Sequence, residues 1–111
     1  MQRFGKVLRL REGAEDEYER HHAQVWPEVL AAIQRSGIRS FNIYRYGRWL
    51  FAYMELPDDA TLEEVGRKIA ADPRSVQWEE LMHRFQEPLP ESKGLNWWVD
   101  MKEIFHYEAR S

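Results

Sequence analysis

The chain contains no cysteine, which excludes disulfide bonds, thiolate metal sites, iron–sulfur clusters and a cysteine nucleophile. No stretch approaches 18 consecutive apolar residues, the length that a membrane-spanning helix needs. The first six residues alternate polar and apolar side chains and lack the continuous apolar core of a secretion signal. We therefore expect a cytoplasmic protein with no membrane partner.

Neither sign of charge dominates the sequence. Lys and Arg total 16 against 19 Asp and Glu, which leaves a net charge of −3, and the basic residues are scattered. A scattered basic set offers few joint phosphate contacts, so we expect no nucleic-acid partner. At 111 residues, of which 43% are hydrophobic, the chain fits one folded domain over residues 1–111 and leaves no room for a separate cofactor-binding domain.

Aromatic residues are abundant by contrast. They make up 14% of the chain, with Trp 5 and Tyr 5. Large rings in so small a domain can fill a core, a subunit interface or a sugar-stacking pocket.

Hydrophobic periodicity predicts a strand, a long helical stretch, two strands, two helices and a final strand. The expected ranges are 2–11, 14–36, 38–46, 48–56, 61–71, 75–85 and 97–107. Pro27 predicts a break around residues 23–26, Gly37 a helix end, and Gly47 a hairpin. Thr61 and Glu64 have the spacing of a capping box. The order β-α-β-β-α(α)-β predicts an α+β fold of the ferredoxin-like kind.

The strand after Gly47 is apolar on both faces. Large side chains alternate along it in two sets: Trp49, Phe51, Tyr53 and Leu50, Ala52, Met54. Helices on one face of a four-stranded sheet leave the second face to another partner, and a second copy of the chain is the simplest one. We therefore predict a homodimer whose sheets pack face to face. Trp97 and Trp98 open the last predicted strand, so we expect one indole in the core and one at this interface, with both lining a pocket as the alternative.

Tyr18 and His22 are the strongest chemical pair. They are four residues apart and so share one helix face, and imidazole is the side chain best suited to proton transfer near neutrality. Spacing alone also fits a partly buried structural histidine paired with Glu or Tyr. Adjacent His21 and His22 project about 100° apart on a helix, so we predict no metal site there.

The motif Tyr18…Arg20-x-His22-x-x-x-Trp26-Pro27-Glu28 resembles that of the L-rhamnose mutarotase family. Further matches are the segments 42–44 (Asn-Ile-Tyr), 50–52 (Leu-Phe-Ala) and 101–105 (Met-x-Glu-Ile-Phe). The resemblance implies a homodimeric α+β barrel and an isomerase without cofactor that interconverts the α and β anomers of a 6-deoxy-hexopyranose. It implies that His22 is the proton donor and Tyr18 a substrate-binding residue.

Two positions depart from the family pattern. Phe41 stands where the family has a second substrate-contacting tyrosine, and Trp78 is followed by Glu79 where the family has two tryptophans. The lost hydroxyl and the gained carboxylate change the hydrogen bonds offered to a sugar, so L-fucose joins L-rhamnose as an expected substrate. Trp78 is expected to stack on the sugar. Glu79 is a candidate for the unidentified base, although an exposed surface carboxylate is the simpler interpretation.

Fold analogy leaves two alternatives open. Small monooxygenases and haem-degrading enzymes share the dimeric α+β barrel, and a non-catalytic barrel protein would keep an open pocket without needing His22.

Overall fold

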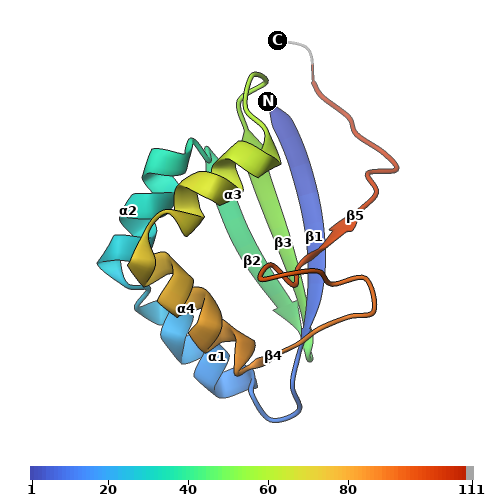
Figure 1. Cartoon of the computed structure of the whole chain (residues 1–111). Helices are drawn as coiled ribbons and strands as arrows, with labels where there is room; N and C mark the ends of the chain where they lie inside the picture. The colour runs from blue at the N-terminus through green and yellow to red at the C-terminus, as the bar shows by residue number, and fades with distance from the viewer. Residues whose placement is uncertain (110–111) are drawn as a thin grey trace.

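Four helices lie on one face of an antiparallel sheet in the computed structural model, which describes residues 1–109 (Figure 1). The last two residues of the predicted 1–111 domain lie outside this range. The elements are β1 (Gln2–Leu10), α1 (Glu15–Ala23), α2 (Pro27–Ser36), β2 (Ser40–Tyr46), β3 (Trp49–Leu56), α3 (Leu62–Ala70), α4 (Pro73–His83), β4 (Gln86–Glu87) and β5 (Val99–Met101).

The sheet has the strand order β2-β3-β1-β4, and β5 also pairs with β1. Every pairing is antiparallel. The N-terminal strand β1 is therefore central, because it pairs with β3 of the β2–β3 hairpin on one side and with β4 and β5 on the other. This topology confirms the predicted ferredoxin-like α+β fold.

The turns form where the sequence predicted them. Trp26 is extended, with ψ at 135°, and Pro27 is the first residue of α2, so the helical stretch is broken as expected. Gly37 and Gly47 have φ of 95° and 59°, a left-handed backbone that glycine adopts without strain. Thr61 Oγ1 accepts a hydrogen bond from the Glu64 amide at 3.1 Å and so caps α3.

The prediction of one long final strand over residues 97–107 was wrong. Two short strands replace it: β4 pairs with the end of β1, and β5 pairs with residues 5–7 of the same edge. Residues 88–98 form a loop between these strands. Beyond Met101 the alternating apolar side chains have no sheet neighbour in the described chain, and Ile104 and Phe105 are 89% and 81% exposed.

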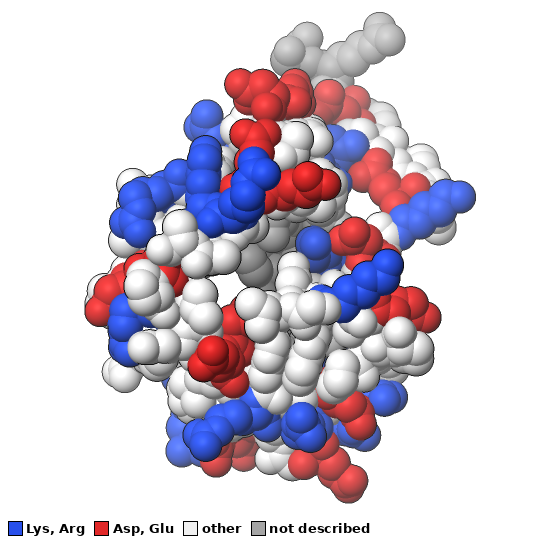
Figure 2. Space-filling view, in the orientation of Figure 1, with Lys and Arg blue, Asp and Glu red and all other residues white. Residues whose placement is uncertain are grey.

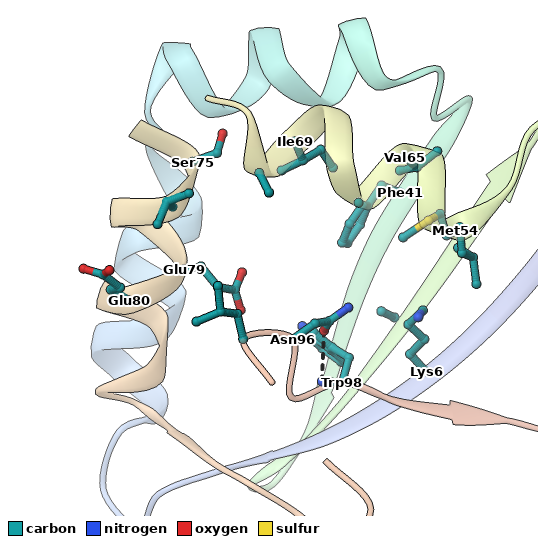
Figure 3. A pocket seen from close by; sticks show the side chains of 16 residues that line it. Lys6, Phe41, Met54, Val65, Ile69, Ser75, Glu79, Glu80, Asn96 and Trp98 are labelled. Carbon is teal, nitrogen blue, oxygen red and sulfur yellow. Dashed lines mark hydrogen bonds between the residues drawn. The ribbon is translucent and has the colours of Figure 1, made fainter. Parts of the chain in front are cut away.

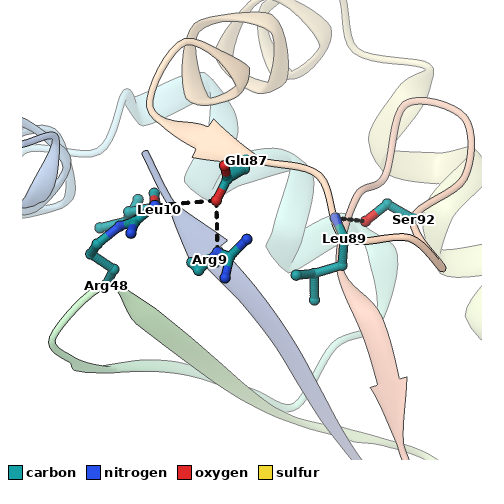
Figure 4. A network of polar contacts seen from close by, with 6 residues as sticks. All are labelled: Arg9, Leu10, Arg48, Glu87, Leu89 and Ser92. Atoms are coloured by element: carbon teal, nitrogen blue, oxygen red, sulfur yellow. Dashed lines mark hydrogen bonds and ion pairs between the residues drawn. The ribbon is translucent and has the colours of Figure 1, made fainter. Parts of the chain in front are cut away.

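Ion pairs fix β4 against the sheet (Figure 4). Glu87 Oε2 accepts hydrogen bonds from Arg9 Nε at 2.6 Å and from Arg48 Nη2 at 3.2 Å. Arg48 Nε also donates to the carbonyl oxygen of Leu10. These contacts hold Glu87, and therefore the neighbouring Gln86, beside the end of β1.

The two faces of the sheet have opposite environments. The inner face carries Leu8, Leu10, Leu50 and Leu56, each at most 1% exposed, beneath the helices. Cross-strand pairs such as Tyr44–Phe51 and Tyr46–Trp49 lie on the outer face, where no helix covers them (Figure 1). The described residues include no helix long and apolar enough to cross a membrane.

Candidate functional site

The space between the helices and the inner face of the sheet contains two adjoining hollows of about 530 and 260 Å³. Five side chains line both of them: Phe41, Ile69, Ser75, Glu79 and Trp98. The surface opens into this space in the view of Figure 2, where Lys and Arg are interspersed with Asp and Glu around it. A cavity of this size accommodates a monosaccharide.

Helix α1 places Tyr18 and His22 against the larger hollow. Their ring centroids are 4.3 Å apart. His22 Nδ1 lies 2.8 Å from the backbone carbonyl oxygen of Tyr18. Because a carbonyl oxygen can only accept, Nδ1 carries the proton, and Nε2 of the neutral ring is left with its lone pair. Burial lowers the pKa of His22 below 6.5, so the neutral ring, a proton acceptor, is the main form at pH 7.

Tyr18 remains a phenol at every physiological pH. The side chain is 3% exposed, and burial raises its pKa to about 12. The Gln86 side-chain amide donates to the phenol oxygen at 3.4 Å. The Tyr18 hydroxyl is therefore suited to donating a hydrogen bond to a ligand oxygen, and it cannot serve as a base.

The Trp78 indole packs against the His22 imidazole. The indole is 8% exposed and meets the imidazole edge to face, with centroids 5.5 Å apart. Trp26 also packs edge to face with Trp78, with ring centroids 5.1 Å apart. Because Trp78 is nearly buried among these neighbours, it orients His22 and offers a ligand little of its surface for stacking.

Glu79 projects from α4 into the cavity, whereas its exposed neighbour Glu80 lies at the edge of the smaller hollow with its carboxylate directed outward (Figure 3). The interpretation of Glu79 as an exposed surface carboxylate was therefore wrong: successive helix residues diverge by about 100°, and Trp78 in the core turns Glu79 toward the hollow. The side chain is 36% exposed, yet Oε1 is buried and has no hydrogen-bond partner among the described residues. Burial raises the pKa of Glu79 to about 7.

Phe41 also faces the cavity. It lies opposite Met54 across β2 and β3 and lines both hollows. The structure thus brings all five predicted site residues, Tyr18, His22, Phe41, Trp78 and Glu79, to one cavity.

Sequence reasoning missed Arg39 and Gln86, among other cavity residues. Gln86 was assigned to a loop, and no periodic pattern marks a two-residue strand. Trp98 was expected in a strand, but it precedes β5 and lines both hollows. Trp97 was expected on a sheet face, but it stacks on His83 at 3.7 Å between ring centroids.

Within residues 1–109, His, Asp and Glu form no group of three or more that could hold a metal ion. His21 Nδ1 donates a hydrogen bond to the carbonyl oxygen of Glu17 in its own helix at 2.8 Å, so this nitrogen is not free to bind a metal.

Comparison with known proteins assigns this arrangement to a family. The family model described as L-rhamnose mutarotase matches residues 3–107. An L-fucose mutarotase of Xanthomonas campestris pv. campestris is 39% identical over 95% of this chain and 87% of its own length. An L-rhamnose mutarotase of Lactiplantibacillus plantarum is 32% identical over 97% and 100%.

Solved structures agree on the fold. The crystal structure of L-rhamnose mutarotase from Formosa agariphila superposes with a TM-score of 0.75 at 20% identity, covering 97% of this chain and 100% of that one. Tetracenomycin F2 cyclase from Streptomyces glaucescens, a type-II polyketide cyclase, superposes with a TM-score of 0.57 at 15% identity, with full coverage of both chains. The match of the family model along nearly the whole chain, with relatives matched over 87% and 100% of their own lengths, shows that this chain belongs to the L-rhamnose mutarotase family.

Proposed function

We propose that this chain is a mutarotase that interconverts the α and β anomers of a 6-deoxy-hexopyranose, L-rhamnose or L-fucose, by acid–base catalysis and without a cofactor. The observation that carries the proposal is a neutral imidazole, hydrogen-bonded through Nδ1 to the Tyr18 carbonyl oxygen, that lines a cavity of sugar size in a chain of this family. Family membership supports the mutarotase and gives no support to the monooxygenase, haem-degrading or non-catalytic alternatives.

The reaction requires two proton transfers. A base takes the proton of the anomeric hydroxyl, C1 becomes a carbonyl carbon as its bond to the ring oxygen breaks, and an acid protonates that oxygen. Rotation about the C1–C2 bond and reclosure give the other anomer. Positioned acid–base groups typically accelerate such steps by 10²–10⁴-fold, and the sugar already mutarotates in water, so a small cavity with two such groups suffices.

The lining of the larger hollow suits a 6-deoxy sugar. Polar groups that can meet ring hydroxyls come from Tyr18, His22, Arg39 and Glu79, while Val29, Ile33, Ile38 and Ile43 form an apolar wall. We propose that the methyl group of the sugar faces the apolar wall. A hydroxymethyl group in the same place would lose its hydrogen bonds to water without replacement, which favours 6-deoxy sugars over hexoses.

We propose that Tyr18, Phe41, Trp78 and Glu79 form the substrate-binding site and that His22 exchanges protons with the sugar. Phe41 supports the sugar without a hydroxyl, and Trp78 acts through its contact with His22 more than through stacking. Trp98, which lines both hollows, is the better candidate for a stacking surface.

We also propose a homodimer in the cytoplasm. The outer sheet face exposes large aromatic side chains, among them Tyr44 at 63% and Tyr46 at 80% exposed. A contiguous aromatic surface of this kind is typical of a subunit interface. A second copy would cover it by packing sheet to sheet, because the face carries the same residues on both copies.

Saturation-difference NMR on anomeric mixtures of L-fucose, L-rhamnose and D-glucose tests the function. Irradiating the anomeric proton of one anomer should reduce the signal of the other anomer when a catalytic amount of the protein is added to either 6-deoxy sugar. The reduction shows that the anomers exchange within the longitudinal relaxation time. The effect should be weak for D-glucose. Absence of transfer for all three sugars would refute the proposed function.

A further inference from the structure

One carboxylate in the cavity has no polar partner of its own. Glu79 Oε1 is buried without a hydrogen bond among residues 1–109. The nearest basic nitrogen is His83 Nε2 at 3.5 Å, but this nitrogen lies 2.8 Å from the carbonyl oxygen of Leu95. Its proton is therefore directed at Leu95. A buried carboxyl oxygen without a partner is costly in a folded protein unless a ligand completes it.

The other polar groups that face the cavity are either held in an ion pair or unable to transfer a proton near neutrality. Tyr18 stays protonated, since its pKa is about 12. Lys6 is paired with Asp100 at 2.9 Å. Arg39 carries a guanidinium that does not release its proton near neutrality. Of the groups that line the larger hollow, His22 and Glu79 are left as the two that can gain and lose protons.

Glu79 and His22 come from different helices, α4 and α1, and line the same hollow. Burial is the main reason that the pKa of Tyr18 is raised, and the Glu79 charge adds to the rise, so the carboxylate and the phenol are close enough to interact electrostatically. Resting on the proposed mutarotase function, we propose that Glu79 is the second acid–base group of the reaction, opposite His22 across the sugar ring.

The proton transfers balance within this pair. Neutral His22 takes the proton of the anomeric hydroxyl through Nε2, and the O–H electron pair forms the C1 carbonyl as the bond from C1 to the ring oxygen breaks. Protonated Glu79 gives its proton to that oxygen. After rotation about C1–C2, the Glu79 carboxylate takes the proton back as the oxygen attacks C1, and the His22 imidazolium returns its proton to the carbonyl oxygen. The enzyme regains its starting state.

This assignment fixes the pH dependence. The reactive form needs neutral His22 and protonated Glu79. Catalysis should therefore decline below the His22 pKa, which lies under 6.5, and above the Glu79 pKa of about 7. A bell-shaped profile of kcat/KM results, with its maximum between the two pKa values.

The test compares wild type with Glu79→Gln, Glu79→Asp and Glu63→Gln by NMR anomer exchange between pH 5 and 9. Glu63 lies in the first turn of α3 and outside the cavity, so its variant is the matched control for removing one carboxylate. Amide resonances of each variant verify the fold. We expect Glu79→Gln to lower kcat by 10²-fold or more and to lose the alkaline limb, while Glu79→Asp keeps measurable activity with that limb present.

Each outcome decides the proposal. Unchanged kcat in folded Glu79→Gln, or a change confined to KM, would overturn the acid–base role and make Glu79 a binding residue or a bystander. An alkaline limb that persists in Glu79→Gln would overturn it as well. No exchange in the wild type with either 6-deoxy sugar would instead refute the mutarotase function itself, so the two failures are distinguishable.

Discussion

Replacing Glu79 by Gln should stabilise the folded protein at alkaline pH, although it removes activity. The substitution keeps the size of the side chain and removes only a charge that the cavity solvates poorly. Because the folded pKa of Glu79, about 7, lies above the ordinary value of 4.5, the folded chain binds this proton more tightly than the unfolded chain. The stabilising contribution of the protonated form is complete below pH 4.5 and is lost as the pH rises through 7.

The magnitude follows from the same two values. At 1.36 kcal/mol for each tenfold change in proton affinity, the difference between 4.5 and about 7 sets an upper bound of ~3 kcal/mol on the cost of the charge. The side chain is 36% exposed, so water screens part of this cost. We expect Glu79→Gln to raise the free energy of unfolding by ~1–2 kcal/mol at pH 8.5, or Tm by roughly 4–8 °C, and to change it little at pH 4.5.

Urea and thermal unfolding of wild type, Glu79→Gln and Glu63→Gln at pH 4.5 and 8.5 measure this difference. Protein concentration must be held constant, because unfolding of a dimer depends on it. Glu63→Gln should differ from wild type by at most a few tenths of a kcal/mol at both pH values. Equal or lower stability of Glu79→Gln at pH 8.5 would show that the carboxylate is well solvated and would refute the burial argument.

Three further substitutions test other parts of the site and the interface. Tyr18→Phe should raise KM about tenfold and lower stability by about 1 kcal/mol, because it removes the hydroxyl that Gln86 contacts at 3.4 Å; unchanged KM and urea midpoint would contradict this. Phe41→Tyr restores a hydroxyl in the cavity and should raise exchange of L-rhamnose relative to L-fucose roughly fivefold, as measured by NMR on each sugar; an unchanged ratio would show that this position does not select the sugar. Phe51→Glu puts a charge on the outer sheet face and should convert the dimer to a monomer in sedimentation velocity; a variant that still dimerises would place the interface elsewhere.

The sequence predicted the elements whose signals are local. Pro27, Gly37, Gly47 and Thr61 each impose a backbone preference that needs no tertiary context, and the structure follows all four. The order of the elements then led to the right topology. The prediction of the final strand failed because alternation shows only which side chains are apolar. It does not show whether a neighbouring strand is present to pair with that segment.

The site was predictable in its residues and less so in their environment. Motif resemblance led to His22 and Tyr18, and both line the cavity. The burial of Glu79 depends on how α4 rotates when Trp78 enters the core, which a carboxylate-rich helix sequence does not reveal. Gln86 reaches Tyr18 only because the ion pairs of Glu87 hold β4 against β1, a contact between residues far apart in sequence.

The most direct test of the central claim is anomer exchange by His22→Asn at pH 6.5, measured by NMR on L-fucose and L-rhamnose. Asn keeps a polar side chain that can still donate toward the Tyr18 carbonyl but has no group that titrates near neutrality. Catalysed exchange should fall to the buffer rate while the amide spectrum and the oligomeric state remain those of the wild type. Wild-type exchange rates in a folded His22→Asn variant would show that this imidazole does not transfer the proton.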